Sequence, residues 1–333
     1  MNRTDILHYL SGAKDEELFA AAHAEKLRVF GKDVYLRGII EFSNHCKNQC
    51  LYCGLRAPNK EAGRYRLSIE NIITLASGLP ELGFGTVVLQ SGDDYHYSTD
   101  DIANIVSTIK SSTNLAITLS LGDRGLDEFR AWREAGADRY LLKLETTNTK
   151  LYEKCRPNES LKDRFQRIEA LQQLGYEVGS GIITGLPDMT NETLADDILK
   201  LTELRLDMLA AGPFIPHPQT PFKDMDNGTT QDAFRVSALL RLLNPEANIP
   251  ATSALDALEQ DGRKKGLQRG CNVIMPSFTP EEVRANYKIY PGKNTFSAGA
   301  VENARLVQEM IRNMGFIPYA GQGPSKRKNR SKG

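Results

Sequence analysis

The sequence predicts an α/β protein built as a (β/α)8 barrel of the TIM type. Short apolar runs alternate with amphipathic stretches from residue 34 onward, and strands that alternate with helices imply βαβ crossovers and a parallel sheet. Eight apolar runs can be drawn, which favours a complete barrel over an open doubly wound sheet. The length of 333 residues is also typical, because α/β barrels often occupy such a length as one domain.

A helical extension is expected in front of the barrel, over residues 1–33. Its apolar residues recur at near-helical spacing: Leu7, Leu10, Leu18, Phe19, Ala22 and Leu27. The barrel is expected over residues 34–320, with strands at 34–42, 86–91, 115–121, 138–144, 177–184, 207–211, 249–254 and 272–275. Helical periodicity marks the stretches 68–82, 99–111, 126–135, 161–174, 191–204 and 229–243.

Residues 321–333 differ from the rest of the chain in composition. They are rich in Gly, Pro and Ser and carry five Lys or Arg residues. This composition predicts a solvated, disordered basic tail, with a docking or RNA-binding arm as the alternative.

Composition limits the classes of partner and the compartment. The 42 basic and 42 acidic residues balance, which gives no reason to expect nucleic acid or an anionic membrane as a partner. No apolar run approaches the ~18 residues that span a bilayer, and the first residues do not form a signal peptide. Three of the five cysteines are clustered, which favours a reducing cytoplasm over a disulfide framework. The isolated Cys155 and Cys271 are expected to be buried, inert thiols.

The most informative segment follows the first predicted strand and contains Cys46, Cys50 and Cys53. Thiolates at spacings of four and three residues can converge on one inorganic centre from a single loop. Cysteine thiolates hold iron–sulfur clusters, and three of them on a four-iron cube leave one iron open for another molecule. No fourth cysteine completes a closed tetrahedral zinc site. A degenerate zinc knuckle and three unrelated reduced thiols are the alternatives.

Polar and glycine-bearing segments end the next predicted strands. In α/β barrels the active site forms at the C-terminal ends of the strands. The second strand ends in residues 90–93, Gln-Ser-Gly-Asp, where glycine lets a ligand approach the backbone closely; an ordinary βα turn is the alternative. The third strand ends in residues 120–123, Ser-Leu-Gly-Asp, and the fourth places Lys143 and Glu145 on one face. For that pair a surface ion pair is the alternative.

The fifth and sixth strands carry unusual residues for a barrel core. Gly179, Gly181 and Gly185 lie in and beside the fifth strand and suggest the close approach of a planar ligand such as adenine. The sixth strand leads into residues 212–218, a rigid segment rich in proline. These segments predict a ligand site at the barrel mouth.

With these residues in view, the chain resembles the radical S-adenosylmethionine (SAM) enzymes. Within them it is most similar to the biotin-synthase-like group, and there to the HydE family of [FeFe]-hydrogenase maturases. The cysteine loop alone indicates only the superfamily. The resemblance extends over residues 34–293 through the segments 40–44, 53–56, 64–66, 89–92, 119–122, 135–142, 212–221, 272–276 and 290–293.

This resemblance implies a [4Fe–4S] cluster on Cys46, Cys50 and Cys53, with SAM bound beside it. The amine of SAM would meet residues 90–93, Glu145 would bind its ribose or amino end, and Arg164 its carboxylate. The expected cofactor-binding residues are Tyr52, Gln90, Ser91, Gly92, Asp93, Ser120, Glu145, Arg164, Ile182, Pro213, Phe214 and Ile215. Of these, Tyr52, Ile182 and the segment 213–215 would border the adenine.

The resemblance also implies an activity and partners. The reduced cluster would cleave SAM to methionine and a 5′-deoxyadenosyl radical, which would act on a small-molecule or iron-complex substrate, expected to be an iron-bearing cysteine complex. An electron donor of the ferredoxin or flavodoxin type and other hydrogenase maturases are the expected protein partners. The residues expected near the substrate are Lys143, Thr252, Ser253, Met275, Tyr287 and Tyr290, with Asp256 at the end of the seventh strand.

Several residues depart from the family pattern. Lys143 and Leu144 replace Arg and His, and lysine cannot reproduce the bidentate grip of arginine on a carboxylate. Asp256 stands where glycine is usual, and no cysteine follows Cys271 to hold an accessory cluster. An acid on this strand is a feature that the chain shares with the methylornithine synthases of pyrrolysine biosynthesis, which it also resembles. An amino-acid mutase is therefore the alternative function. A non-catalytic iron–sulfur carrier or scaffold and a zinc-stabilised barrel are alternatives of other classes.

Overall fold

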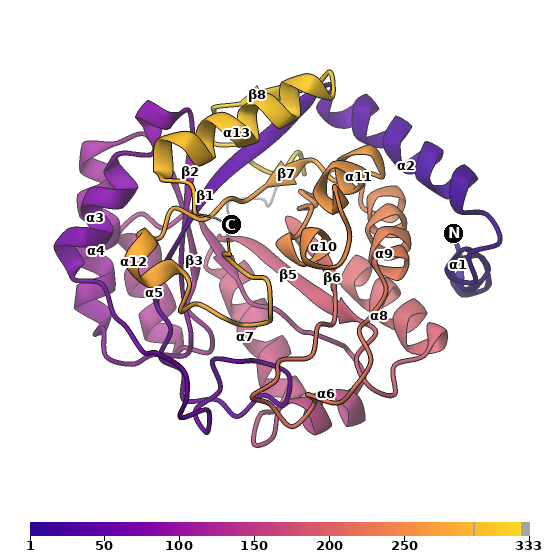
Figure 1. The fold of residues 1–333 in the computed structure, drawn as a ribbon, viewed down its shortest axis with the longest axis horizontal. Coiled ribbons are helices and arrows are strands. Elements are labelled where there is room, and N and C mark those ends of the chain that lie inside the picture. The colour runs from indigo at the N-terminus through magenta and orange to yellow at the C-terminus, as the bar shows by residue number, and fades with distance from the viewer. Residues whose placement is uncertain (296, 328–333) are drawn as a thin grey trace.

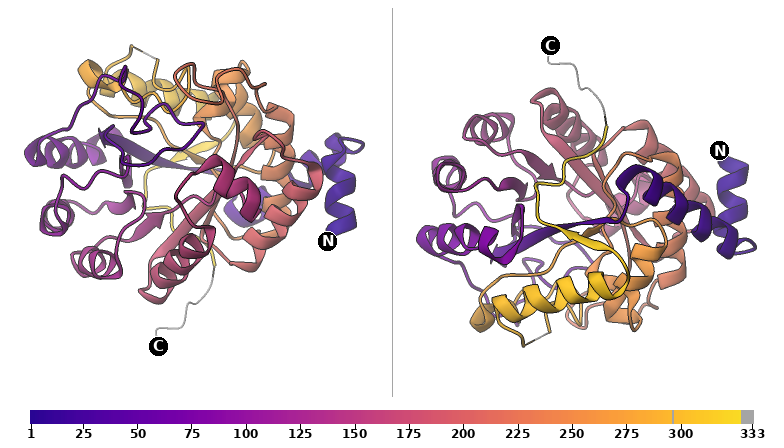
Figure 2. Two further views of the ribbon diagram at one scale, coloured as in Figure 1. Left: turned by 90° about the horizontal axis from the view of Figure 1, so that it is seen from below. Right: turned by 90° about the horizontal axis from the view of Figure 1, so that it is seen from above.

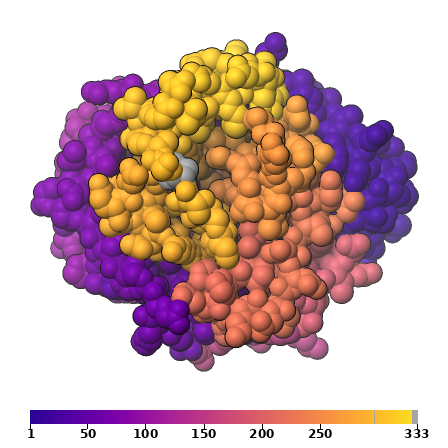
Figure 3. Space-filling model, viewed as in Figure 1, coloured from indigo at the N-terminus to yellow at the C-terminus, as the bar shows by residue number. Residues whose placement is uncertain are grey.

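The computed structural model describes residues 1–295 and 297–327 of the chain. It confirms the predicted α/β barrel class, because a curled parallel sheet lies at the centre and helices surround it (Figure 1). On the face shown in Figure 3, the last third of the chain (orange to yellow) covers the middle and the N-terminal segment (indigo) lies at the rim.

The sheet within the described residues has eight strands, seven of which follow the order β6-β5-β4-β3-β2-β1-β7, while β8 pairs with β1. All of these named strands pair in parallel, so the C-terminal ends of β1–β7 gather at one end of the barrel. Their bounds are β1 (Asp33–Ser43), β2 (Thr86–Ser91), β3 (Ala116–Ser120), β4 (Arg139–Leu141), β5 (Glu177–Thr184), β6 (Met208–Pro213), β7 (Val273–Ile274) and β8 (Ile317–Tyr319).

The segment 248–251 joins the two edges of the sheet, β6 and β7. The Leu209 N–H donates to the Asn248 carbonyl (2.9 Å), and the Ala251 N–H donates to the Val273 carbonyl (3.0 Å). The predicted seventh strand at 249–254 is therefore reduced to isolated bridges. Pro250 has no N–H to donate, and helix α10 already begins at Ser253. Together with β1–β7, the segment 248–251 makes eight parallel segments, and the barrel closes around them.

Six of the helices around the sheet begin at side-chain caps. Ser68, Ser98, Asn148, Ser160, Thr190 and Thr229 each accept a hydrogen bond from a backbone N–H of the first helical turn, which satisfies a donor that the helix leaves free. These caps begin α3 (Ile69–Ser77), α4 (Thr99–Ser112), α6 (Thr149–Cys155), α7 (Leu161–Gln173), α8 (Asn191–Glu203) and α9 (Thr230–Leu243). The others after β1 are η1 (Pro80–Leu82), α5 (Leu126–Glu134), α10 (Ser253–Leu258), α11 (Gly262–Gln268), α12 (Glu281–Arg284) and α13 (Ala300–Asn313).

Two parts of the chain extend the barrel. Residues before β1 form α1 (Arg3–Leu10) and α2 (Asp15–Phe30), which pack against α8 and α9. At the other end, α13 leads to β8, which pairs with the first residues of β1 (Figure 2). The sequence pattern predicts neither α13 nor β8.

Residues 321–327 differ from the solvated tail expected for 321–333. The Gln322 carbonyl accepts from Thr86 Oγ1 (2.8 Å), and the Gly323 carbonyl accepts from Arg37 Nη2 (3.1 Å) and Asn248 Nδ2 (3.2 Å). These partners lie at the N-terminal end of the barrel, so the segment 321–327 covers that end. The remaining tail residues, 328–333, lie outside the described part of the chain.

Candidate active site

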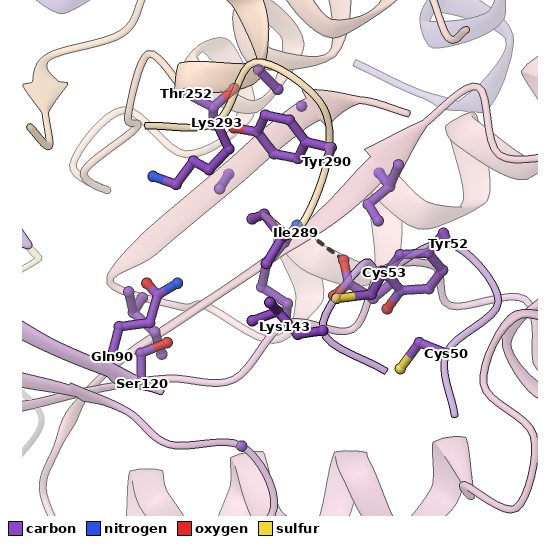
Figure 4. A pocket seen from close by; sticks show the side chains of 18 of the residues that line it. Cys50, Tyr52, Cys53, Gln90, Ser120, Lys143, Thr252, Ile289, Tyr290 and Lys293 are labelled. Carbon is purple, nitrogen blue, oxygen red and sulfur yellow. Dashed lines mark ion pairs between the residues drawn. The ribbon is translucent and has the colours of Figure 1, made fainter. Parts of the chain in front are cut away.

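A cavity of about 360 Å³ opens at the C-terminal ends of the strands, a size typical of small-ligand sites. Figure 4 shows Cys50, Tyr52 and Cys53 on one side, Thr252, Tyr290 and Lys293 on another, and Lys143 between them. Each strand from β2 to β7 contributes to the wall within or just beyond its C-terminal end: Gln90, Ser120, Glu145, Ile183, Pro213 and Met275. The position agrees with the rule for α/β barrels.

The cysteine loop is fixed by main-chain hydrogen bonds to distant parts of the fold. The Leu51 N–H donates to the Cys155 carbonyl (2.9 Å), and the Gly54 N–H donates to the Ile289 carbonyl (3.1 Å). Arg64 donates to four carbonyls of the same loop. The loop therefore places all three cysteines of the predicted motif on the cavity wall.

Burial disfavours the thiolate form of these cysteines. It raises the pKa of Cys46 to about 11 and also raises the pKa of Cys50 and Cys53. Thiolates are the species that bind metal, so bound iron has to offset this cost. In the described residues, no three His, Cys, Asp or Glu side chains are arranged to hold a single metal ion. A cube differs from a single ion because its thiolates sit on separate irons.

Two glycines allow the loops after β1, β2 and β3 to come together. A Cβ on Gly92 would lie 2.2 Å from the His45 carbonyl oxygen, and one on Gly122, whose φ is +75°, would lie 1.5 Å from Asp93 Oδ1. Asp93 accepts from the Asp123 N–H (2.7 Å) and from the side chain of Asn48. Its own N–H lies 3.4 Å from Cys46 Sγ. The turn after β2 is thus tied to the first cysteine.

Glu145 has an unusual backbone conformation for a residue with a side chain, with φ at +65°. Its N–H donates to the Gly181 carbonyl and its own carbonyl accepts from the Ile183 N–H, both at 2.9 Å. Strain of this kind occurs at functional sites where the surroundings enforce it. Its Oε2 lies 2.9 Å from Lys143 Nζ. Burial disfavours the carboxylate, but Lys143 and Arg156 outweigh burial and hold the pKa of Glu145 below its ordinary value.

Arg156 is a lining residue that the sequence motifs did not reveal. Its Nη1 donates to the Tyr52 hydroxyl (3.1 Å), and among the described residues its buried Nε has no hydrogen-bond acceptor. The neighbouring Arg164 Nη2 lies 2.8 Å from Asp123 Oδ2. This part of the cavity therefore contains positive charge, on the buried guanidinium groups of Arg156 and Arg164, and negative charge, on the carboxylate of Glu145.

The far wall carries hydroxyl, amide and ammonium groups. Ser253 Oγ lies 2.6 Å from the Tyr290 hydroxyl, and Gln90 Nε2 donates to the Tyr287 hydroxyl (2.9 Å). A second residue missed from the sequence is Lys293, whose Nζ lies 3.2 Å from the buried Glu41.

Comparison with known proteins identifies the family. Residues 40–201 match the Radical SAM superfamily. The [FeFe] hydrogenase maturase subunit HydE of Thermotoga maritima is 43% identical over 313 residues, which covers 94% of this chain and 90% of that protein. The chain belongs to the radical SAM superfamily. Its members use a [4Fe–4S] cluster and SAM, so the predicted family, enzyme class and cofactors are confirmed.

Two further similarities are to methylornithine synthases. The 3-methylornithine synthase of Methanosarcina acetivorans is 32% identical over 277 residues, covering 82% of this chain and 78% of that one. The crystal structure of methylornithine synthase superposes with a TM-score of 0.84 at 28% identity, over 95% of this chain and 94% of that chain.

The cavity of this radical SAM protein fits both cofactors. SAM carries an ammonium group and a carboxylate, and the cavity wall contains the acid Glu145 and the buried bases Arg156 and Arg164. The unpaired Nε of Arg156 is a buried donor that a ligand can satisfy. The three cysteine thiols lie on the same wall.

None of the helices in the described residues is long and apolar enough to span a membrane.

Most of the predicted site residues line the cavity, but two do not. Ile182 is fully buried in the core, and its neighbour Ile183 faces the cavity instead. Asp256 lies in α10, where its carboxylate binds the backbone N–H (2.7 Å) and the guanidinium of Arg263. The other predicted residues on the wall are Cys46, Cys50, Tyr52, Cys53, Gln90, Ser91, Gly92, Asp93, Ser120, Lys143, Glu145, Arg164, Pro213, Phe214, Ile215, Thr252, Ser253, Met275, Tyr287 and Tyr290.

The glycines of β5 have a different role from the one expected. A Cβ on Gly179 would lie 2.3 Å from Leu141 Cδ2, and one on Gly181 would lie 2.3 Å from the Ala210 carbonyl oxygen. A Cβ on Gly185 would lie 2.4 Å from Gly228 Cα. These glycines therefore permit close packing within the protein, and none of the three lines the cavity.

Proposed function

We propose that this radical SAM protein matures [FeFe]-hydrogenase, as a protein of the HydE type. The observation that carries the proposal is the 43% identity to the Thermotoga maritima maturase over nearly the full length of both chains. Fold alone would not suffice, because one fold supports many functions.

In this proposal the wall residues divide into three groups. Cys46, Cys50 and Cys53 would hold the cluster, which would supply the electron for the reductive cleavage of SAM. Glu145 and Arg164 orient SAM. The shape of the cavity supports this division, because the cysteines and the far wall lie on different sides (Figure 4).

The substrate would occupy the space between Lys143 and the far wall. Lys143 keeps 42% of its side chain exposed to the cavity and offers a point positive charge for an anionic substrate group. The hydroxyls of Thr252, Ser253 and Tyr290 offer hydrogen bonds. One positive charge together with three hydroxyl groups suits a cysteine carboxylate or an anionic iron complex.

The alternative function is that of an amino-acid mutase resembling methylornithine synthase. The 32% identity and the TM-score of 0.84 favour it. The carboxylate that suggested it does not, because Asp256 is bound to Arg263 outside the cavity wall. The maturase is therefore the better-supported proposal.

Complementation tests the proposal. A host that lacks its own HydE is expected to regain hydrogenase activity with the wild-type chain and not with Cys50→Ala. Failure of the wild-type chain, despite cluster-loaded protein in the host, would exclude the maturase function and favour the mutase. A cluster-loaded protein that never forms 5′-deoxyadenosine with dithionite and SAM would indicate a carrier or scaffold instead.

A further inference from the structure

We propose that the outer side of the cysteine loop is the docking surface for an acidic protein that carries single electrons. The proposal rests on the proposed function, since it requires the cluster. We call this surface the cluster-loop face and define it by Lys47, Lys60, Arg64, Arg66 and Tyr95.

Cys46 connects the interior of the barrel with this surface. It lines the interior cavity and also two hollows on the surface. One hollow includes Lys47, Arg66 and Tyr95 together with the buried acids Asp93 and Asp94, and the other includes Lys60 and Arg64. The rate of electron transfer falls steeply with distance, so a carrier seated over Cys46 has a short path to a cluster on that thiolate.

The cluster-loop face is positive in a chain that is neutral as a whole. Residues 45–66 contain five basic residues, Lys47, Arg56, Lys60, Arg64 and Arg66, and one acid, Glu61. Arg66 is paired with Asp94 (2.7 Å). In the part of the chain that the structure describes, Lys47, Lys60 and Arg64 form no ion pair with a carboxylate. Arg64 bonds there only to main-chain carbonyls, so its charge is not neutralised.

Tyr95 gives this face an aromatic contact point. Half of the residue is exposed, although its position is fixed: its hydroxyl donates to the Asp123 carbonyl (2.5 Å), and Lys47 Nζ lies 4.3 Å from its ring centroid. Arg124 stacks on the ring at 4.0 Å. Tyrosine and arginine are enriched among the residues that dominate binding energy at protein interfaces.

This combination suits a transient electron-transfer complex. Such complexes bury little surface, below about 1,200 Å², so a large apolar patch is not required. A positive surface speeds the encounter with an acidic partner and orients it. In the complex the carrier loses one electron and the cluster gains one, and no bond or proton is transferred.

The test measures reduction of the cluster by a purified, reduced, acidic flavodoxin in stopped-flow experiments on cluster-loaded protein. Reversing two charges in Lys47→Glu/Lys60→Glu is expected to lower the second-order rate constant about tenfold at low salt. Salt should reduce the wild-type rate strongly and the variant rate less, because ions screen surface charges. The matched control is Lys32→Glu, an exposed lysine at the opposite end of β1.

Dithionite separates docking from cluster chemistry. With dithionite as reductant, wild type and both variants are expected to form 5′-deoxyadenosine at equal rates, since the small reductant needs no docking surface. Absence of this reaction in wild type would contradict the proposed function, not the docking surface. If the double variant loads its cluster poorly, Lys60→Glu alone should lower the flavodoxin rate about threefold. Unchanged flavodoxin rates, or an equal loss in Lys32→Glu, would overturn the proposal.

Discussion

At the scale of single residues, Glu145 combines backbone strain with a functional position. Its positive φ is fixed by main-chain bonds to β5, so the carboxylate is held toward the cavity. Glu145→Gln keeps the shape and the backbone cost but removes the charge. We expect the dissociation constant of SAM to rise about 10- to 100-fold, since a buried charged hydrogen bond loses one partner.

Equilibrium dialysis of SAM against anaerobic, cluster-loaded protein measures this effect. The iron content should match that of wild type, because Glu145 is not a cluster ligand in our assignment. An unchanged dissociation constant would remove Glu145 from the SAM site.

The position of Asp256 leads to a second prediction. Its carboxylate is bound to Arg263 in a partly exposed ion pair, and such pairs contribute about 0.5 kcal/mol to stability. Asp256→Asn should therefore leave SAM cleavage and substrate turnover unchanged, whereas Lys143→Gln, on the cavity wall, should impair turnover. The two variants are compared by 5′-deoxyadenosine and product yields. Loss of turnover in Asp256→Asn alone would restore the mutase interpretation.

Most residues of the cavity wall could be predicted from the sequence, because their residue types are unusual for the positions at which they occur. The spacing of the cysteines, and the polar residues at strand ends, are enough to indicate the barrel mouth. Ile182 shows the limit: alternation along a strand is clear, but its phase is not, and one residue decides between core and cavity. Arg156 and Lys293 were missed because a single basic residue in a helix end or loop carries no pattern.

At the scale of secondary-structure elements, burial and residue pattern explain which strands could be predicted from the sequence and which could not. β1 was predictable because ten of its eleven residues are buried and six of them are hydrophobic. The seventh predicted strand, 249–254, is interrupted by Pro250 and by the start of α10. β8 has only three residues, two of them exposed, and Pro318 stands at its centre, where a proline argues against a strand in the sequence.

Helix α2 contains a buried lysine that gives a pH-dependent prediction. Lys26 Nζ donates to the Leu267 carbonyl (3.0 Å) and lies 3.5 Å from the Phe316 ring centroid. Burial lowers the pKa of Lys26 to about 7, against about 10.4 for an unperturbed lysine. Between these values the unfolded chain binds a proton that the folded chain lacks. The free energy of unfolding therefore rises with pH, by at most about 1.4 kcal/mol per pH unit.

Lys26→Met should remove this dependence. The variant is expected to be more stable than wild type near about pH 6, with the difference shrinking toward about pH 9 as the wild-type lysine loses its proton in the fold. Thermal unfolding under anaerobic conditions at several pH values measures it, with Lys32→Met as an exposed control. A stability difference that is independent of pH would contradict a buried, titrating Lys26.

At the scale of the whole molecule, the C-terminal segment belongs to the barrel. Its composition of Gly, Pro, Ser and basic residues resembles a disordered tail. Its main contacts use the carbonyls of Gln322 and Gly323, and every residue type has a carbonyl. Composition therefore could not reveal that residues 321–327 cover the N-terminal end of the barrel.

This segment also supports a charge buried beneath the active-site cavity. Arg37 is almost fully buried, and burial lowers its pKa to about 9. Its guanidinium donates to the Gly323 carbonyl and to Met208 Sδ, both at 3.1 Å. Met208 in turn lines the cavity. The segment 321–327 is thus linked to the floor of the site through Arg37 and Met208.

Truncation tests this link. A chain that ends at Ala320 leaves Arg37 without its carbonyl acceptor and Arg139 without the Gln322 carbonyl (3.0 Å). We expect a loss of about 2–4 kcal/mol in the free energy of unfolding, because a buried charged donor becomes unsatisfied. A chain that ends at Arg327 keeps these contacts and is the matched control, expected to unfold at the wild-type midpoint in anaerobic calorimetry. If both truncations unfold like wild type, the C-terminal segment does not stabilise the barrel, and the buried Arg37 must be satisfied by groups other than this segment.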